Sequence, residues 1–195
     1  MTLVSEVIEG EGKHPKHRIM KYREWFAGKV QKEWTLLDIG SNNGHMANFL
    51  SNFSSHVYGI EISQDMVDLA NQINQKDNIK YICADATTFD YKNIKIDCVT
   101  MSNVLEHIEN RVEFLKKLIT QINWTSTPLF LIRVPLIDRD WMPVYLNELN
   151  LDSRLDQTHY TEYTLESFQH ELKNSGLIME SHHIQWGEIY AVCKK

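Results

Sequence analysis

The strongest structural signal in the chain is the stretch Leu36-Leu37-Asp38-Ile39-Gly40-Ser41-Asn42-Asn43-Gly44-His45. An apolar run over residues 34–39 predicts a buried strand, which a turn of small residues and a helix follow. Gly40 and Gly44 let the backbone turn tightly and let a ligand approach without a Cβ in the way. Such a turn lies at the carboxyl end of a central strand, where open α/β sheets bind ligands. By itself a glycine turn is a weak motif, so its meaning depends on what lies beside it.

Further apolar runs along the chain indicate six more strands. They occupy residues 56–60, 79–83, 94–101, 129–134, 177–184 and 188–193. The last two are separated by Gln185-Trp186-Gly187, which is typical of a hairpin. Helical patterns separate the earlier runs. Strands that alternate with helices imply a mostly parallel sheet covered on both faces.

Apolar side chains at helical spacing predict the intervening helices. A leading helix over residues 17–31 forms a helical cap within residues 1–32, and another helix at 164–175 ends at Gly176, which suits the C′ position. The predicted inward faces are Ile19, Tyr22, Phe26 and Val30, then Met46, Phe49, Leu50 and Phe53, then Met66, Leu69, Ala70 and Ile73, and finally Leu115, Leu118, Ile119 and Ile122.

The connection over residues 135–163 has no such pattern, apart from one short predicted helix at 144–149. Loops of more than ~12–15 residues in compact domains are usually lids or binding loops. We therefore interpret residues 135–163 as a substrate lid.

Composition places the chain among globular proteins. It has 195 residues, 43% of them hydrophobic, and a net charge of −6. This predicts one domain over residues 1–195 and excludes a disordered chain. No apolar run approaches the ~20 residues of a membrane helix, and the N-terminus lacks the apolar core of a secretory signal. Cys83, Cys98 and Cys193 form no CxxC pair, which favours a cytoplasmic location over a disulfide framework.

The charge pattern disfavours a nucleic-acid partner. Only residues 13–23 form a basic stretch free of acids, and the rest of the chain is acidic. Nucleic-acid binders usually show a basic face. A solvated helix entry explains this stretch better than a phosphate-binding patch does. The oligomeric state stays open.

Two acids support a binding site beside the glycine turn. Glu61 follows the second strand, 23 residues after Asp38. In Rossmann-like folds an acid at this place accepts hydrogen bonds from ribose hydroxyls. Asp85 follows the third strand. A single acid there is more often a turn former, but three strands that present polar groups at one sheet edge indicate a nucleoside-bearing ligand.

At these residues the sequence resembles the class I S-adenosylmethionine-dependent methyltransferases, over nearly the whole chain. Asp38-Ile39-Gly40-Ser41-Asn42-Asn43-Gly44 resembles their first motif, Glu61-Ile62-Ser63 the second and Ala84-Asp85-Ala86 the third. The segment 103–108, Asn-Val-Leu-Glu-His-Ile, resembles the one after strand four in the small-molecule branch, of the ubiquinone O-methyltransferase type. Asn42 replaces the middle glycine of the first motif, and Asn tolerates the left-handed conformation better than other non-glycine residues.

The resemblance implies a single-domain, Rossmann-like, doubly wound α/β fold. Its seven strands would have the order 3-2-1-4-5-7-6, with the seventh antiparallel. It also implies S-adenosylmethionine as cofactor and S-adenosylhomocysteine as product. In this scheme the methionine moiety faces Asp38 and the turn residues Gly40, Ser41, Asn42 and Gly44, and its carboxylate is covered by Arg18 and Tyr22. Glu61 holds the ribose, Ile62 packs on the adenine, and Asp85 and Ala86 bind the adenine. The floor under the sulfonium is formed by Asn103 and Val104.

Two other functions stay open at this point. One is an NAD(P)-binding Rossmann oxidoreductase, although its G-x-G-x-x-G fingerprint lacks the last glycine here. The other is a non-catalytic, methyltransferase-like binding module, because a fold does not determine a function.

For the methyltransferase function we expect a small-molecule acceptor, methylated at oxygen rather than at nitrogen or carbon. The position after strand four lacks the Asn/Asp-Pro-Pro-aromatic turn of amino-group methylation, and Cys98 lies inside an apolar strand. His107 and His159 are the candidate bases, since histidine titrates near neutrality. We prefer His159 slightly, because it lies on the adaptable connection.

A divalent metal is the alternative to a free base. Glu106, His107 and a later histidine resemble the metal site of small-RNA 3′-end 2′-O-methyltransferases and some quinone O-methyltransferases. Asn103 stands where that site has an acid, and a hard cation prefers carboxylate oxygens. We therefore do not favour a metal.

Overall fold

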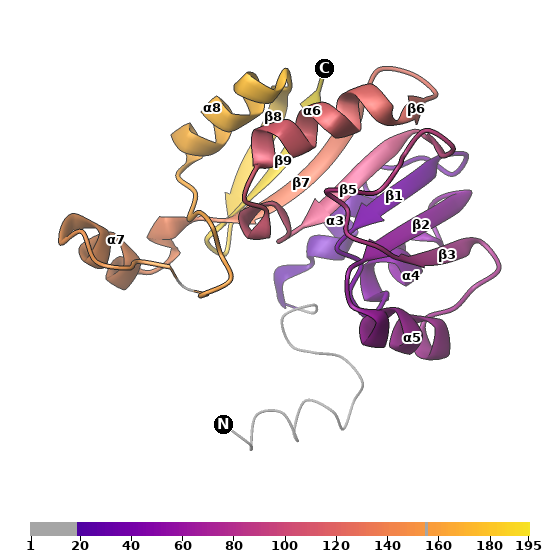
Figure 1. Ribbon diagram of the computed structural model, residues 1–195, viewed down its shortest axis with the longest axis horizontal. Coiled ribbons are helices and arrows are strands. Elements are labelled where there is room, and N and C mark those ends of the chain that lie inside the picture. The colour runs from indigo at the N-terminus through magenta and orange to yellow at the C-terminus, as the bar shows by residue number, and fades with distance from the viewer. Residues whose placement is uncertain (1–18, 155) are drawn as a thin grey trace.

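The computed structural model describes residues 19–154 and 156–195 and shows a twisted sheet between two layers of helices (Figure 1). The seven strands have the spatial order β3-β2-β1-β5-β7-β9-β8. β9 runs antiparallel to both β7 and β8, and the other neighbours are parallel. This arrangement confirms the predicted order, with β5 as the fourth strand of the expected scheme. The strands are β1 (Thr35–Ile39), β2 (His56–Glu61), β3 (Ile79–Cys83), β5 (Cys98–Ser102), β7 (Leu129–Pro135), β8 (Ile178–Gln185) and β9 (Glu188–Lys194).

The two faces of the sheet carry different helices. α3 (Tyr22–Ala27), α4 (His45–Leu50) and α5 (Gln64–Ile73) cover one face, and α6 (Arg111–Gln121) and α8 (Leu165–Ser175) cover the other (Figure 1). Each layer has its own apolar core, because successive strand residues point to opposite faces. The residues at the strand ends therefore rest on a sheet that is packed from both sides.

The predicted strand at 94–101 is interrupted. Asp97 separates β4 (Lys95–Ile96) from β5. Its carboxylate accepts the Thr35 N–H at 2.7 Å and the Thr125 hydroxyl. β4 then pairs with β6 (Asn123–Trp124) in a separate two-stranded sheet. A carboxylate inside a buried run needs donors, and the strand breaks where Asp97 meets them.

Helix ends differ from the predictions where local geometry ends a helix early. Lys21 adopts φ 50°, so α3 begins at Tyr22, and Ile19 is 46% exposed. α4 ends at Leu50, which leaves Phe53 exposed. α5 buries the predicted Ala70 together with Val67, whereas the predicted Ile73 is exposed. The predicted inward face of α6 is confirmed, since all four of its apolar residues are buried.

The long connection is more ordered than its sequence suggests. After β7 it forms the 3₁₀ helix η2 (Ile137–Arg139) and the helix α7 (Trp141–Glu148), so the predicted helix at 144–149 had the wrong boundaries. α7 starts early because the Asp140 carboxylate accepts the Met142 N–H at 3.0 Å and Pro143 fits the first turn. The Ile137 N–H donates to the Tyr163 carbonyl at 2.8 Å and joins the two ends of the connection.

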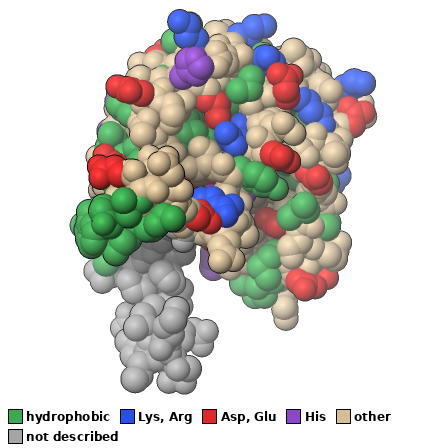
Figure 2. Space-filling view, turned by 60° about the vertical axis from the view of Figure 1, so that its left-hand side comes forward, with side chains coloured by type: hydrophobic (Ala, Val, Ile, Leu, Met, Phe, Trp, Pro, Cys, Tyr) green, Lys and Arg blue, Asp and Glu red, His purple; other side chains and the backbone are tan. Residues whose placement is uncertain are grey.

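Between these joined ends, α7 projects away from the sheet (Figure 1). An apolar patch lies over this projection (Figure 2), and its exposed side chains are Trp141, Met142, Tyr145 and Leu149. Over residues 19–154 and 156–195, no helix combines the length and the apolar character that a membrane crossing requires.

Candidate active site

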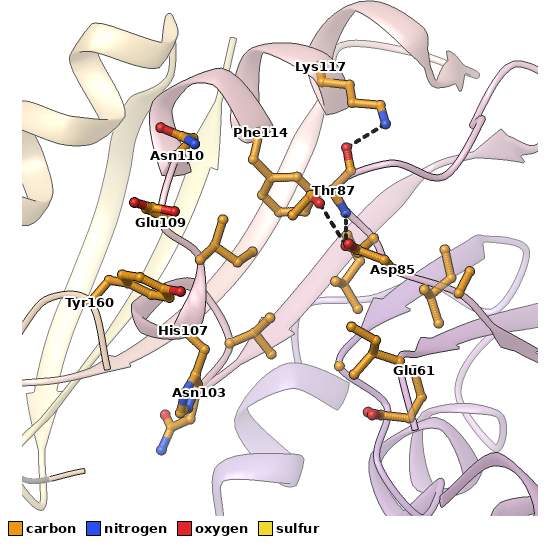
Figure 3. Close-up of a pocket in the computed structure, with 18 of the residues that line it drawn as sticks. Glu61, Asp85, Thr87, Asn103, His107, Glu109, Asn110, Phe114, Lys117 and Tyr160 are labelled. Carbon is orange, nitrogen blue, oxygen red and sulfur yellow. Dashed lines mark hydrogen bonds between the residues drawn. The ribbon is translucent and has the colours of Figure 1, made fainter. Parts of the chain in front are cut away.

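The carboxyl ends of the central strands border one cavity of about 920 Å³ (Figure 3). It collects polar groups from segments far apart in the sequence, as predicted for a sheet edge of this kind. Nine of the predicted site residues line it, namely Gly40, Asn42, Glu61, Ile62, Asp85, Ala86, Asn103, Val104 and His107. The connection adds Tyr160 to the wall.

The glycine turn needs its glycines. Gly40 and Gly44 have φ values of 70° and 81°, which L side chains rarely adopt. A Cβ on Gly40 would lie 2.5 Å from Val104 Cγ2, and one on Gly44 would lie 2.4 Å from the Tyr81 hydroxyl. Asn42 adopts φ 47°, in line with its expected tolerance of the left-handed region. Gly44 shapes the turn without lining the cavity.

Glu61 links the glycine turn to the end of β2. Its Oε2 accepts the Asn42 N–H at 2.9 Å, and its Oε1 accepts the Ser63 N–H at 3.0 Å. Each carboxylate oxygen can accept more than one hydrogen bond. The side chain therefore lies fixed at the cavity wall and keeps acceptor capacity for a ligand.

The next part of the wall combines a fixed carboxylate with an exposed apolar surface. Asp85 Oδ1 accepts the Thr87 N–H at 2.8 Å and the Thr87 hydroxyl at 2.7 Å (Figure 3). Ile62 is 69% exposed, although it is apolar and lies in the cavity. An exposed aliphatic side chain beside an oriented carboxylate suits a flat base with a polar edge.

A smaller cavity of about 270 Å³ lies on the other side of the glycine turn, and Gly40 and Asn42 border both cavities. Tyr22, Asp38 and Ser41 line the smaller one, together with Arg133. These three predicted residues therefore lie apart from the larger cavity. The predicted residue Arg18 lies outside the described residues.

Asp38 is almost fully buried in the wall of the smaller cavity. Its Oδ1 accepts the Thr100 hydroxyl at 2.8 Å, and its Oδ2 has no hydrogen-bond partner within residues 19–154 and 156–195. Burial raises the pKa of Asp38 to about 7; the Thr100 hydrogen bond opposes this shift, and the charge of Glu61 adds to it. An unpaired acceptor of this kind favours a cationic ligand.

The two candidate bases occupy different environments. His107, in the 3₁₀ helix η1 (Leu105–His107), is exposed and lines the large cavity. Its Nδ1 lies 3.0 Å from the Thr158 hydroxyl, and burial and then the neighbouring His159 lower its pKa. His159 is buried, with its Nδ1 2.7 Å from Glu162 Oε1. Only His107 of this pair lies in the described wall of the large cavity.

Glu106 joins the two histidines. One ligand atom of each of these three residues lies within 4.8 Å of the others. Glu106 is buried, and neither carboxylate oxygen meets a hydrogen-bond partner in the described parts of the chain. Burial raises its pKa to about 8. The tertiary structure thus brings His159 beside Glu106 and His107, which are adjacent in the sequence, and forms a polar cluster of three residues.

Sequence reasoning missed a buried ion pair at the same sheet edge. Arg133 Nε lies 2.9 Å from Glu188 Oε2, and both side chains are almost fully buried. Arg133 Nε also donates to Asn103 Oδ1 at 3.2 Å, and Asn103 Nδ2 donates to Glu188 Oε1 at 3.4 Å. One signal was available, because Arg133 interrupts the apolar run 129–134.

A seven-stranded sheet of this order, with a glycine turn and acids at its strand ends, defines a Rossmann-like methyltransferase fold. Two solved structures share it. The S-adenosylmethionine-dependent methyltransferase of Aquifex aeolicus has a TM-score of 0.70 at 14% identity, over 97% of this chain and 96% of that chain. A chain solved in a complex with the Haloferax volcanii Trm112 methyltransferase activator has a TM-score of 0.73 at 12% identity, over 92% of both chains.

Sequence comparison supports the same class. Residues 37–121 match the family model of a methyltransferase domain. The ubiquinone biosynthesis O-methyltransferase of Coxiella burnetii is 28% identical over 83 residues, which are 42% of this chain and 36% of that protein. The match therefore spans little more than a third of the curated relative. The fold is that of the class I S-adenosylmethionine-dependent methyltransferases, and residues 37–121 match a methyltransferase domain.

This class implies S-adenosylmethionine as cofactor and S-adenosylhomocysteine as product, and the residues present fit them. The left-handed glycines admit a close ligand, Glu61 and Asp85 present fixed carboxylates, and Ile62 offers an apolar surface. The unpaired Oδ2 of Asp38 lies in the adjoining cavity.

Proposed function

We propose that this domain transfers a methyl group from S-adenosylmethionine to an oxygen atom of a small-molecule acceptor. The observation that carries the proposal is that one cavity is lined both by Glu61 and Asp85, the proposed nucleoside-binding residues, and by the imidazole of His107. When bound, the sulfonium supplies an activated methyl group. The protein then has to position the acceptor about 3 Å from it and remove a proton.

In this proposal the predicted cofactor residues that line the two cavities keep the roles given above. Glu61 holds the ribose, Asp85, Ala86 and Ile62 hold the adenine, and the glycine turn with Asp38 meets the methionine moiety. Asn103 and Val104 form the floor beside the acceptor. The support for Asn103 is its fixed amide, which Arg133 and Glu188 hold from behind.

His107 is the proposed general base. It is exposed in the cavity wall, and its lowered pKa keeps the imidazole neutral near pH 7, as a base requires. The Thr158 hydroxyl lies beside Nδ1, so Nε2 is the nitrogen that takes the proton from the acceptor hydroxyl. His159, which Glu162 orients, packs edge-to-face against His107 with ring centroids 4.7 Å apart and holds its ring in place.

A small molecule is the acceptor that the dimensions and charge favour. The cavity holds about 920 Å³, within the ~300–1,000 Å³ of small-molecule sites. The net charge of −6 disfavours the phosphate backbone of a nucleic acid. Residues 135–163 reach the cavity through Tyr160 and serve as the proposed substrate lid.

A divalent cation is the second candidate for activating the acceptor. The Glu106, His107 and His159 cluster has metal-ligand spacing, and a cation would compensate the buried carboxylate of Glu106. In that case His107 is a ligand rather than the base. Asn103, a neutral side chain where an acid would strengthen the site, weighs against this candidate.

The test measures S-adenosylhomocysteine formed by the purified domain with the small-molecule fraction of a cell extract, and separately with its macromolecular fraction. We expect turnover with the small-molecule fraction. His107→Ala should slow it by the ~10²–10⁴-fold typical of a lost general base, with cofactor binding intact. His170→Ala, an exposed histidine on α8, is the matched control.

Chelation separates the two candidates. If His107 is a free base, a chelator leaves the wild-type rate unchanged. If a cation activates the acceptor, the chelator reproduces the loss, and added Mg²⁺ or Mn²⁺ restores the rate. Full activity in both His107→Ala and His159→Ala would contradict both schemes.

A further inference from the structure

The small cavity contains a buried cation with an unused donor. Arg133 is 3% exposed and lines this cavity. Its Nε serves Asn103 and Glu188, whereas its Nη1 has no hydrogen-bond partner in the described ranges 19–154 and 156–195. A buried donor without an acceptor costs about 1–3 kcal/mol, and more when it is charged. The side chain is therefore one acceptor short.

The same cavity contains a buried acid with an unused acceptor. Asp38 in β1 pairs in register with Thr100 in β5, and Ser102 pairs with Arg133 in β7. Thr100 and Ser102 are two residues apart in one strand, so Asp38 and Arg133 lie on the same face of the sheet. Asp38 Oδ2 is unpaired, like Arg133 Nη1. The wall thus lacks one donor at Asp38 and one acceptor at Arg133.

An α-amino acid group supplies both, since its ammonium donates and its carboxylate accepts. We propose that Arg133 binds the carboxylate of the methionine moiety of the cofactor and that Asp38 binds its ammonium group. This inference rests on the proposed function, because it needs S-adenosylmethionine as the ligand. It assigns the carboxylate to a strand residue, whereas the sequence pointed to Arg18.

Contacts with Tyr22 and Glu188 fix the orientation of the Arg133 guanidinium before a ligand binds. The Tyr22 ring covers its guanidinium, with Cζ 4.0 Å from the ring centroid, and Glu188 Oε2 pairs with its Nε at 2.9 Å. A fixed guanidinium loses little conformational freedom when it binds a carboxylate. Tyr22 on α3 therefore contributes by holding Arg133, and it keeps its predicted place at the methionine end.

The test compares three ligands by titration calorimetry on the whole domain. They are S-adenosylhomocysteine, its analogue without the carboxylate, 5′-deoxy-5′-(3-aminopropylthio)adenosine, and 5′-methylthioadenosine, which lacks the whole amino-acid part. We expect the wild type to prefer S-adenosylhomocysteine over the carboxylate-free analogue by about 10- to 100-fold, as for one charge-assisted hydrogen bond.

Two Arg133 variants should lose most of this preference. Arg133→Lys keeps the charge beside Glu188 and removes the guanidinium fork. The double variant Arg133→Met, Glu188→Gln removes the pair together, so that no buried charge is left alone. Asp38→Asn should instead weaken both amine-bearing ligands alike. Binding of 5′-methylthioadenosine should stay unchanged in all of them, and thermal unfolding shows that each is folded.

Two controls make the result specific. Arg111→Lys alters a similar ion pair, with Glu171 at 2.7 Å between α6 and α8, and should keep the preference. Arg18→Gln should keep it too. The proposal is overturned if Arg133→Lys and the folded double variant both retain the full preference, or if only Arg18→Gln abolishes it. If the wild type binds none of the three ligands, the proposed function itself fails, and this assignment fails with it.

Discussion

Glu61 shows how one residue can stabilise a turn and prepare a ligand contact. Its two carboxylate oxygens accept backbone N–H groups from Asn42 and Ser63, so the side chain is oriented before the proposed ribose contact forms. Orientation before binding saves the conformational entropy that a mobile side chain would lose. The hydrogen bond from the Asn42 N–H ties Glu61 to the residue of the turn that adopts φ 47°.

Glu61→Ala should therefore weaken S-adenosylhomocysteine binding by a few kcal/mol, at ~1.5–3 kcal/mol for each charge-assisted hydrogen bond. Calorimetry on the purified variant measures the loss. Glu180→Ala, an exposed acid on β8 that pairs with Lys194, is the control and should bind normally. Unchanged affinity in Glu61→Ala would remove the ribose assignment.

At the scale of elements, the connection between β7 and α8 is held by hydrogen bonds at its two ends, whereas α7 in its middle projects into solvent. The Leu136–Tyr163 bridge joins the ends, and the Tyr160 N–H donates to the Glu106 carbonyl at 2.8 Å. α7, by contrast, exposes Trp141 and Tyr145 to solvent and projects from the body (Figure 1). Few packing contacts and exposed backbone make a segment open easily.

We expect the amides of α7 to exchange hydrogen faster than those of β1 and β5, and to gain protection when S-adenosylhomocysteine and the acceptor are both bound. Hydrogen exchange followed by mass spectrometry measures this change. The amides of α8 are the internal control and should keep their protection. Equal exchange of the α7 amides in both states would contradict the proposal that this connection is a substrate lid, but it would not affect the assignment of the cavity.

At the scale of the whole molecule, two buried acids make stability depend on pH. Burial raises the pKa of Asp38 to about 7 and that of Glu106 to about 8. The folded state therefore binds these protons more tightly than the unfolded state does. Such a group contributes stability that is fully present below its unfolded pKa, near 4, and is lost as the pH rises through its folded pKa.

We therefore expect the ligand-free domain to be more stable in urea at pH 5 than at pH 8. Asp38 alone contributes about 3 kcal/mol to this difference, because it acts mainly between pH 5 and its folded pKa of about 7, at ~1.4 kcal/mol per pH unit. Asp38→Asn should flatten the dependence between pH 4 and 7, and Glu106→Gln should remove much of what remains. The exposed Asp65→Asn is the control. An unchanged pH profile in Asp38→Asn would show that this acid is already ionised.

Local patterns in the sequence were enough to predict an α/β fold and the edge of the sheet at which the candidate site lies. Apolar runs, small-residue turns and helix caps act between neighbours, so the alternation of strands and helices, the Gly176 helix end and the Trp186-Gly187 hairpin follow from the local sequence. The strand order, by contrast, was predicted from the family resemblance. The acids Glu61 and Asp85 lie where the turn pattern places them, since each follows its strand directly.

Only the tertiary structure decided which polar groups lose their water and which partners they meet. Arg133 meets Asn103 and Glu188 from three strand ends, and Asn103 and Glu188 are 85 positions apart in the chain. His159 is buried while His107 opens into the cavity, although the sequence slightly favoured His159 as the base. Desolvation and charge pairing depend on what other elements bring to the same place, and local periodicity does not contain that information.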